Sequence, residues 1–341
     1  MSNYTPLNEL GEFGLIRKIQ ETIQLENAST VVGIGDDAAV LQPGQENLVV
    51  TTDMLVEGIH FDLTFCPLRH LGYKAVAVNV SDIAAMNAIP TQITVSLAIG
   101  SRYTVEAIEE LYAGIRMACD NYKVDLVGGD TTSSNAGLVI CITAIGEVGK
   151  GQAVLRSTAQ ANDLICVTGD LGAAYLGLQV LEREKQVFLD NPEMQPDLQQ
   201  KEYLVQRQLK PEARMDVIYE LKELGVKPTA MIDISDGLAS ELMHICSQSQ
   251  VGAAIYQDKL PVDQQVLDTA EEFRLDPVMC ALNGGEDYEL LFTVALSDFD
   301  KIRNHPDITI IGKMTPAAEG VRLVTPSGNT FPVKAQGWTH F

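Results

Sequence analysis

Between Gly33 and Ile83 the sequence reads Gly33-Ile34-Gly35-Asp36-Asp37, then Thr51-Thr52-Asp53-Met54-Leu55, then Asn79-Val80-Ser81-Asp82-Ile83. Each of these three motifs sets acidic side chains inside a run of apolar or small residues. Moving a carboxylate into apolar surroundings is costly unless a cation or a set of hydrogen-bond donors meets it. Three such motifs so close together therefore predict that their carboxylates converge on shared metal ions.

The bulk composition is that of an ordinary globular protein, with 341 residues, 46% of them hydrophobic and 21% charged. This length predicts two domains, each large enough for its own core. The formal charge of −22 argues against a nucleic-acid backbone or an anionic membrane as a partner, because both repel an acidic surface. A substrate that carries phosphates would need metal ions to offset that charge locally.

Cysteine usage and the N-terminus indicate the compartment. The six cysteines contain no C-x-x-C pair and stand in apolar contexts, as the reduced core residues of a cytosolic protein do. The N-terminus lacks a basic-then-apolar signal, and no run approaches the ~18 apolar residues that a membrane span needs. The sequence therefore predicts a soluble cytoplasmic enzyme.

The first half of the chain predicts a βαβαββ-like unit. A long buried helix is expected at residues 67–86, where Asn79 and Asp82 share one face. A second helix is expected to begin after Thr104, which can cap it. Strands are expected at residues 38–41, 47–52, 91–99, 124–127 and 138–148. Gly149-Lys150-Gly151 marks the predicted boundary between the two domains.

The second half predicts another α/β unit. A strand at residues 163–168 runs into Gly169-Asp170-Leu171-Gly172, a glycine turn before a helix. Further helices are expected at residues 213–224, 238–248 and 264–273, and further strands near residues 252–256, 288–294 and 307–312. The polar, proline-containing residues 183–200 are predicted to form an exposed excursion.

Aspartates recur where a predicted strand ends or along the apolar helix, at Asp53, Asp82 and Asp130. Mg²⁺ takes one or two carboxylates and completes its octahedron with water and phosphate oxygens. These aspartates, with the hydroxyls of Thr51 and Thr52 beside them, therefore predict a cluster of such ions around a polyphosphate. In Gly128-Gly129-Asp130 the glycines let backbone N–H groups approach an anion, although a plain glycine turn gives the same pattern.

Two motifs in the second half extend this acidic pattern. Asp233-Ile234-Ser235-Asp236-Gly237-Leu238 is not an EF-hand loop, because Leu238 and His244 stand where such a loop needs Gly and Glu. Asp233 and Asp236 are instead predicted to be further carboxylates that face metal. Gly284-Gly285-Glu286-Asp287-Tyr288-Glu289 is either a solvated turn or a site for a cationic substrate. The sequence contains neither a P-loop nor the protein-kinase motifs H-R-D and D-F-G.

Taken together, these motifs resemble thiamine-monophosphate kinase, a family of the wider aminoimidazole ribonucleotide synthetase superfamily. The resemblance spans the whole chain in order and is carried by residues 11–13, 33–37, 51–56, Gly58, His60, 79–86, 128–132, 234–238 and 284–291. It implies an α/β (α+β), two-domain PurM-like fold, with an N-terminal mixed sheet with helices plus a C-terminal α/β domain. Residues 1–150 would bind metal and ATP and form the dimer, and residues 151–341 would contribute to ATP and substrate binding.

The resemblance also implies a reaction, the ATP-dependent phosphorylation of thiamine phosphate to thiamine diphosphate, with several Mg²⁺ ions and a homodimer built through the N-terminal sheets. Carried over by position, the metal-binding residues are Asp37, Thr51, Thr52, Asp53, Asp82, Asp130, Asp233 and Asp236. The residues that meet ATP are Gly129, Asp130, Arg156 and Ser235. Those that meet thiamine phosphate are His60, Glu286 and Trp338. The implied catalytic residues are Asp53, Asp82, Asp130 and Arg156.

The chemistry of the reaction agrees with these residue types. A phosphate monoester is mostly ionised near pH 7, since its second pKa is about 6, so the acceptor needs no strong general base. Bringing two anionic phosphates into line requires several Mg²⁺ ions and an arginine.

Two alternatives stay open. The first is another ATP-using member of the superfamily with a different acceptor, and the second is a non-catalytic acidic module that binds metal or nucleotide. Selenophosphate synthetase is disfavoured, because the first cysteine of this chain is Cys66 and not a residue of an N-terminal glycine-rich loop.

Overall fold

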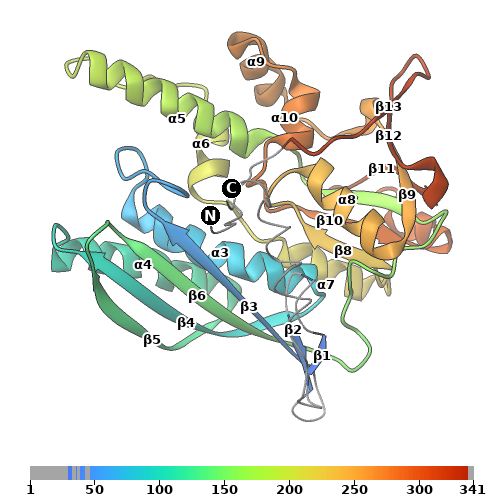
Figure 1. Ribbon diagram of the computed structural model, residues 1–341, viewed down its shortest axis with the longest axis horizontal. Helices are drawn as coiled ribbons and strands as arrows, with labels where there is room; N and C mark the ends of the chain where they lie inside the picture. The colour runs from blue at the N-terminus through green and yellow to red at the C-terminus, as the bar shows by residue number, and fades with distance from the viewer. Residues whose placement is uncertain (1–29, 33–35, 37–38, 43–46, 337–341) are drawn as a thin grey trace, which may run out of the picture.

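The computed structural model describes residues 30–32, 36, 39–42 and 47–336. These residues form two sheets with helices, one sheet in each half of the chain (Figure 1). We call residues up to Val148 the N-terminal half and residues from Leu164 onward the C-terminal half. The predicted boundary at residues 149–151 lies between the last strand of the first sheet and the first strand of the second.

The first sheet is mixed, as predicted. Its six strands lie in the order β1-β2-β3-β6-β4-β5, and only the pair β4–β5 is parallel. The strands are β1 (Thr30–Val32), β2 (Ala39–Leu41), β3 (Asn47–Val56), β4 (Ile89–Gly100), β5 (Asp125–Ser134) and β6 (Val139–Val148). Two helices, α3 (Leu68–Ala85) and α4 (Val105–Tyr122), cover one face of this sheet (Figure 1). In the part of the chain that the structure describes, no helix covers the other face.

Helix α3 is buried on nearly every side, which explains its Ala- and Val-rich sequence. It lies against β3, β4 and β6 on one side and against α4 on another. The contact with α4 is close, because a Cβ added at Gly72 would lie 2.0 Å from the carbonyl oxygen of Leu111. The helix predicted at residues 67–86 is therefore confirmed almost to the residue, and polar side chains on it are held by packing from all directions.

The second sheet has seven strands in the order β13-β12-β9-β11-β7-β10-β8. They are β7 (Leu164–Thr168), β8 (Ala230–Asp233), β9 (Val251–Tyr256), β10 (Leu290–Val294), β11 (Ile308–Pro316), β12 (Val321–Val324) and β13 (Thr330–Pro332). The longer helices of this half are α5 (Ala173–Asp190), α6 (Glu202–Leu209), α7 (Met215–Glu223), α8 (Leu238–Ser249), α9 (Gln264–Phe273) and α10 (Pro277–Asn283), and α11 (Phe299–Ile302) is a single turn.

The two halves share a hydrophobic core. One face of the second sheet, with Cys166 and Phe292, packs with Val217 of α7 into the same buried cluster as Val76 of α3. The opposite face, which includes Ile165, packs against α8. The relative position of the halves is therefore fixed by apolar packing as well as by polar contacts.

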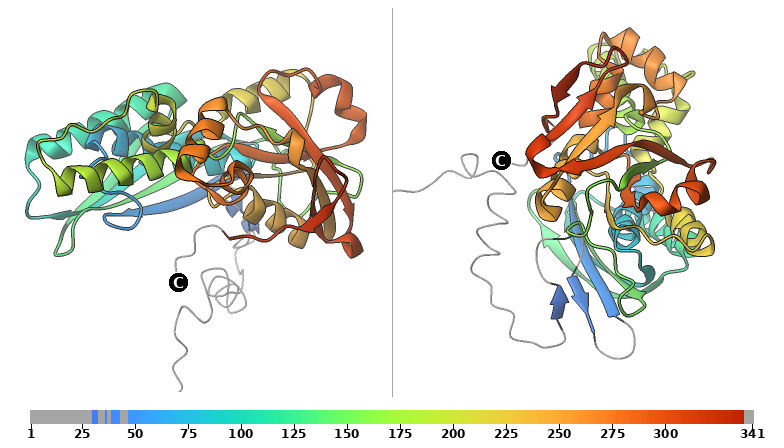
Figure 2. Two further views of the ribbon diagram at one scale, coloured as in Figure 1. Left: turned by 90° about the horizontal axis from the view of Figure 1, so that it is seen from above. Right: turned by 90° about the vertical axis from the view of Figure 1, so that its right-hand side faces the viewer.

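Two parts of the C-terminal half differ from the prediction. Residues 183–190, predicted as part of an exposed excursion, form the last two turns of α5, which extends over the N-terminal half (Figures 1 and 2). The prediction was wrong there because Val180, Leu181 and Glu184 are buried and continue the helix that begins at Ala173. The sequence reading also missed the short elements α6, α10, β8, β12 and β13.

No helix in the described ranges is long and apolar enough to cross a membrane. All six cysteines lie in described residues and carry free thiols, and only Cys141 is not buried.

Candidate active site

A pocket of about 1000 Å³ opens between the two halves. The N-terminal half contributes the end of β3, the loop at residues 57–66 and one side of α3. The C-terminal half contributes α5, the turn at residues 234–237 and residues 275–288. Seven of the predicted site residues line this pocket: Asp53, His60, Asp82, Asp233, Ser235, Asp236 and Glu286.

Four carboxylates line the pocket, on β3, α3, β8 and the turn after β8, and side chains of β3 and α3 make hydrogen bonds to three of these four residues. Thr51 Oγ1 donates a hydrogen bond to Asp82 Oδ2 at 2.5 Å. The side chain of Asn79 accepts one from the backbone nitrogen of Asp53 at 3.1 Å. Ser81 Oγ donates to Asp233 Oδ2 at 2.6 Å. One buried helix thus links the ends of β3 and β8. The fourth carboxylate of this acidic cluster is that of Asp236, in the turn after β8.

The ring of Tyr288 lies within the field of these carboxylates. Burial raises the pKa of its hydroxyl well above the ordinary value, and the charges of Glu286, Asp53, Asp233 and Asp82 raise it further. Tyr288 therefore stays neutral at physiological pH. Carboxylates from both halves of the chain therefore act on the same buried hydroxyl.

The acidic cluster fits hard divalent cations. Its donors are carboxylate oxygens, and Mg²⁺ and Ca²⁺ prefer oxygen ligands. Asp53, Asp82 and Asp233 act on the buried Tyr288 together with Glu286, and so many negative charges in one pocket favour binding of a compensating cation. Asp53, Asp82, Asp233 and Asp236 are therefore the residues best placed to hold magnesium ions, with Thr51 fixing Asp82.

Glu286 lies on a strained turn in the pocket wall. Gly285, Glu286 and Tyr288 have φ angles of 73°, 57° and 52°, in the left-handed region that non-glycine residues avoid. Backbone hydrogen bonds hold them there, because Glu286 N donates to Ser235 O at 2.6 Å and Tyr288 N donates to Ile234 O at 2.9 Å. The turn at residues 234–237 and the segment 284–289, predicted as separate motifs, form one unit.

A buried ionic network holds the segment 284–289 on the side away from the pocket. Glu289 accepts from Arg207 Nη1 at 2.7 Å and from Arg214 Nη1 at 2.8 Å. Asp287 Oδ2 accepts from the backbone nitrogen of Gly172 at 2.8 Å, near the start of α5. Burial raises the pKa of Asp287 to about 7. The three acidic residues of the segment therefore have different roles. Glu286 lines the pocket, whereas Asp287 and Glu289 anchor the backbone.

His60 lies in the loop that follows β3. Its Nδ1 accepts a hydrogen bond from the backbone nitrogen of Val56 at 3.0 Å, which fixes the imidazole against the start of the loop. Asp62 in the same loop pairs with Lys185 of α5 at 2.7 Å. A contact between the halves therefore holds this side of the pocket together.

Several predicted residues lie away from this pocket in the single chain. Thr52 follows the two-residue alternation of β3 and points to the opposite face of the sheet, where its hydroxyl meets Ile142 O at 3.0 Å. Gly129 and Asp130 lie on β5, which is exposed along most of its length. Gly129 is required there, because a Cβ would lie 1.8 Å from the carbonyl oxygen of Val95. In a single chain Thr52 and Asp130 therefore lie apart from the carboxylates that line the pocket, and their role in binding metal stays a prediction.

Arg156 also lies outside the pocket lining and pairs with Asp36, with 3.4 Å between Nε and Oδ1. The backbone nitrogen of Arg156 donates to Asp36 Oδ2 at 3.2 Å. Asp37 and Trp338, predicted to bind metal and thiamine phosphate, are outside the described residues.

Sequence reasoning missed Lys74 and Gln208, which line the pocket beside Glu286. Lys74 carried a usable signal, because it stands in the apolar run Tyr73-Lys74-Ala75-Val76. A buried lysine needs a partner for the same reason that a buried aspartate does. Gln208 carried no such signal.

A second hollow, of about 460 Å³, lies where β4 ends and α4 begins. Its lining is largely aromatic and aliphatic, with Tyr103, Ile108 and Tyr112, and Arg116 at its border. No sequence motif indicated it.

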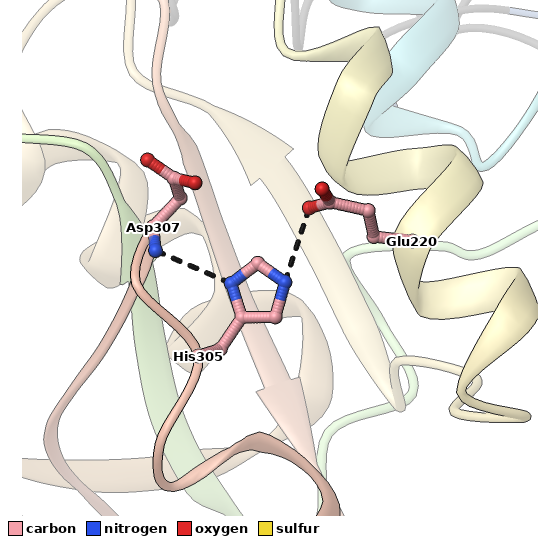
Figure 3. A group of neighbouring side chains, drawn as sticks. All are labelled: Glu220, His305 and Asp307. Atoms are coloured by element: carbon pink, nitrogen blue, oxygen red, sulfur yellow. Dashed lines mark hydrogen bonds and ion pairs between the residues drawn. The ribbon is translucent and has the colours of Figure 1, made fainter.

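A separate group of polar side chains, Glu220, His305 and Asp307, lies at one site on the C-terminal half (Figure 3). His305 Nε2 is 3.0 Å from Glu220 Oε2, and the backbone nitrogen of Asp307 donates to His305 Nδ1 at 3.2 Å. Both ring nitrogens are therefore engaged, and Arg214 lies 3.7 Å from the Asp307 carboxylate. This arrangement is a hydrogen-bonded group that joins α7 to the start of β11, and it does not offer a histidine ligand to metal.

Comparison with known proteins identifies the family. The model of the AIR synthase related protein N-terminal domain matches residues 35–148, and that of the C-terminal domain matches residues 160–324. Thiamine-monophosphate kinase of Bacillus subtilis (strain 168) is 36% identical over 339 residues, covering 97% of this chain and 100% of the relative. That of Aquifex aeolicus (strain VF5) is 36% identical over 338 residues, covering 98% of this chain and 99% of the relative.

Solved structures agree. The structure described as AaThiL complexed with AMPPCP and TMP has a TM-score of 0.84 and 34% identity, and the match covers all of both chains. Thiamine-monophosphate kinase from Stenotrophomonas maltophilia K279a gives a TM-score of 0.72 at 36% identity, over 92% of this chain and 96% of that one. The hydrogenase maturation protein HypE in complex with ATP, at 20% identity and a TM-score of 0.68 over 94% of each chain, shares the fold alone. The two-domain fold implied by the resemblance is thus confirmed, and the chain belongs to the thiamine-monophosphate kinases within the AIR synthase related proteins.

Proposed function

We propose that this protein transfers the terminal phosphoryl group of ATP directly to the phosphate of thiamine phosphate, releasing thiamine diphosphate and ADP. The observation that carries the proposal is the pocket between the halves, which is lined by the acidic cluster and also by Glu286 and His60. The relative solved with AMPPCP and TMP has the same fold over its full length, which supports this assignment.

The residues of the pocket suit a reaction between two anions. Asp53, Asp82, Asp233 and Asp236 would hold magnesium, and magnesium in turn would offset the charge of the phosphates and keep them in line. Tyr288 is neutral and adds no further negative charge between them. Glu286 and His60 would contact the acceptor, and Ser235, in the turn that leads into α8, would contact the nucleotide.

Gly129, Asp130, Thr52 and Arg156 would complete the nucleotide and metal site, together with Asp37. The first two lie on the exposed strand β5, and Thr52 lies on the sheet face that no described helix covers. We propose that a second copy of the chain covers this face and that ATP lies in a groove against the partner or the neighbouring domain. The protein would then be a cytoplasmic homodimer, and Trp338 would contact thiamine phosphate.

The dimer makes a first prediction. Val127 on β5 is 57% exposed, and we expect Val127→Glu to separate the subunits, because it places a charge on a surface that the partner would bury. Light scattering after gel filtration should give twice 37.1 kDa for the wild type and 37.1 kDa for the variant. Leu296→Glu is the matched control, because Leu296 is 62% exposed and lies in the C-terminal half, outside the first sheet. This variant should stay dimeric. A monomeric wild type would exclude the proposal.

The reaction makes a second prediction, that no covalent phosphoenzyme forms. The acceptor is already anionic, and the pocket presents carboxylates without an adjacent base-activated nucleophile. Incubation with γ-labelled ATP and magnesium, without acceptor, should leave the denatured protein unlabelled. A stable label on an aspartate or histidine would contradict direct transfer.

The function is tested by measuring ADP release with a panel of phosphate-ester acceptors and identifying each product by mass. We expect thiamine phosphate alone to stimulate ADP release and to yield thiamine diphosphate. If another acceptor is phosphorylated instead, the chain is an ATP-using member of the superfamily with a different substrate. If ATP binds but no acceptor is phosphorylated, the chain is a binding module.

A further inference from the structure

Two ion pairs join the halves along the pocket, and all four of their residues line it. Lys74 of α3, in the N-terminal half, lies 2.8 Å from Glu286 of the C-terminal half. Lys185 of α5, in the C-terminal half, lies 2.7 Å from Asp62 of the N-terminal half. The Lys74 side chain is the more buried of the two lysines, at 4% exposed against 22%.

The Glu286 carboxylate is held at both oxygens. Oε1 pairs with Lys74 Nζ, and Oε2 accepts from Gln208 Nε2 at 2.6 Å. Lys74 Nζ also donates to the backbone oxygen of Gln208 at 3.2 Å. Gln208 Oε1 is buried and has no hydrogen-bond partner among the described residues. The amide is therefore oriented so that its nitrogen donates to Glu286 while its oxygen accepts no hydrogen bond.

Lys74 also shares a side of α3 with Asp82. The two residues are eight positions apart, lie on the same side of the helix together with Val78, and all three line the pocket. A rise of ~1.5 Å per residue separates them by ~12 Å along the axis. The same rigid helix therefore carries one carboxylate of the acidic cluster and the ammonium group that holds Glu286.

We propose that Lys74 is a positioning residue for the acceptor, which acts through Glu286. It holds the Glu286 carboxylate in place and compensates its charge, and it ties the strained segment 284–289 to α3. Acceptor recognition thereby depends on the Lys74–Glu286 contact between the two halves. The inference rests on the proposed function, in which Glu286 contacts thiamine phosphate.

The proposal predicts a specific pattern of coupling. Lys74→Met leaves the Glu286 carboxylate partly buried without its cation, and Glu286→Gln leaves a buried ammonium group without its anion. Either change should reduce kcat/KM for thiamine phosphate by about 30-fold or more, the usual result of truncating one partner of a buried, hydrogen-bonded charge pair. The double variant Lys74→Met/Glu286→Gln removes both charges and should be no worse than the poorer single variant, because Lys74 has no further route to the acceptor.

The experiment measures steady-state kinetics of these three variants with each substrate varied in turn, and unfolding midpoints confirm that each variant is folded. KM for ATP should stay within about threefold of wild type. Lys74→Arg keeps the charge and should recover part of the acceptor kcat/KM. Lys222→Met, an exposed lysine on α7, is the matched control and should behave as wild type. If Lys74→Met does not fold, Lys74→Gln and Lys74→Gln/Glu286→Gln carry the same test with a polar side chain in place of the ammonium group.

Several outcomes would overturn the inference. Multiplicative effects in the double variant would show that Lys74 acts independently of Glu286, and an equal rise in KM for ATP would place it on the nucleotide. Wild-type kinetics for Lys74→Met would show that the pair is only structural. If the wild type itself does not convert thiamine phosphate, the proposed function fails and this inference fails with it. If the wild type is active and the effects of the two single variants simply add in the double variant, this inference is refuted while the proposed function stands.

Discussion

Asp82→Asn should reduce turnover by about 10³-fold while leaving the fold intact, the scale of losing one group that stabilises charge in a transition state. The asparagine keeps the size of the side chain and can still accept the hydrogen bond from Thr51 Oγ1, so the variant changes charge and little else. Asp53→Asn should behave similarly, because Asp53 lies in the same pocket at the end of β3. Turnover is measured by ADP release over a range of magnesium concentrations.

The same variants should not lower the free energy of unfolding in the presence of a chelator. Removing one of four crowded carboxylates relieves like-charge repulsion, so unchanged or slightly higher stability is expected. Arg69→Ala is the control on the same helix, since Arg69 forms an exposed pair with Glu110 outside the pocket. Turnover close to wild type for Asp82→Asn at millimolar magnesium would refute the assignment of the acidic cluster to metal.

The convergence of Asp53, Asp82, Asp233 and Asp236 on one pocket could be predicted from the sequence. Asp53, Asp82 and Asp233 each have an apolar neighbour in the chain, which favours a shared compensating environment, whereas Asp236 was predicted from its place in the same motif as Asp233. The helix that carries Asp82 was predictable for the same reason, because a long run of Ala and Val is stable only when buried on all sides.

Other parts of the site depend on information that one chain's sequence pattern does not contain. Strand β5, with Gly129 and Asp130, is exposed in the single chain. Whether these residues belong to a metal or nucleotide site depends on what covers the strand, and the pattern of one sequence does not contain that information. Thr52 is different, because the two-residue alternation of a strand separates it from Thr51 and Asp53 and was visible in the sequence. The contact of Gln208 with Glu286 joins residues 78 positions apart and has no local signal.

Arg207→Met should lower the free energy of unfolding by about 3 kcal/mol or more and should also weaken acceptor binding. Its guanidinium pairs with Glu289 at 2.7 Å and donates to the backbone oxygens of Asp170 and Asp287 at 3.1 and 3.3 Å. Glu289 is almost fully buried, and breaking a buried pair leaves a charge that burial penalises by about 3–5 kcal/mol. Arg214 keeps its own contact with Glu289, which places the expected loss at the lower end of that range.

Stability is measured by urea unfolding, with Arg303→Met as the control. Arg303 pairs with Asp300 at 3.2 Å, but these side chains are 51% and 82% exposed, so the control should change the free energy of unfolding by less than about 1 kcal/mol. Acceptor binding is measured by calorimetry at a temperature where both variants are folded. Arg207 does not line the pocket, so weaker binding of thiamine phosphate with unchanged binding of an ATP analogue would show that the network acts by holding segment 284–289 in its left-handed conformation. A loss of stability without any loss of acceptor binding would show instead that the strained turn is maintained by its backbone hydrogen bonds to Ser235 and Ile234 alone.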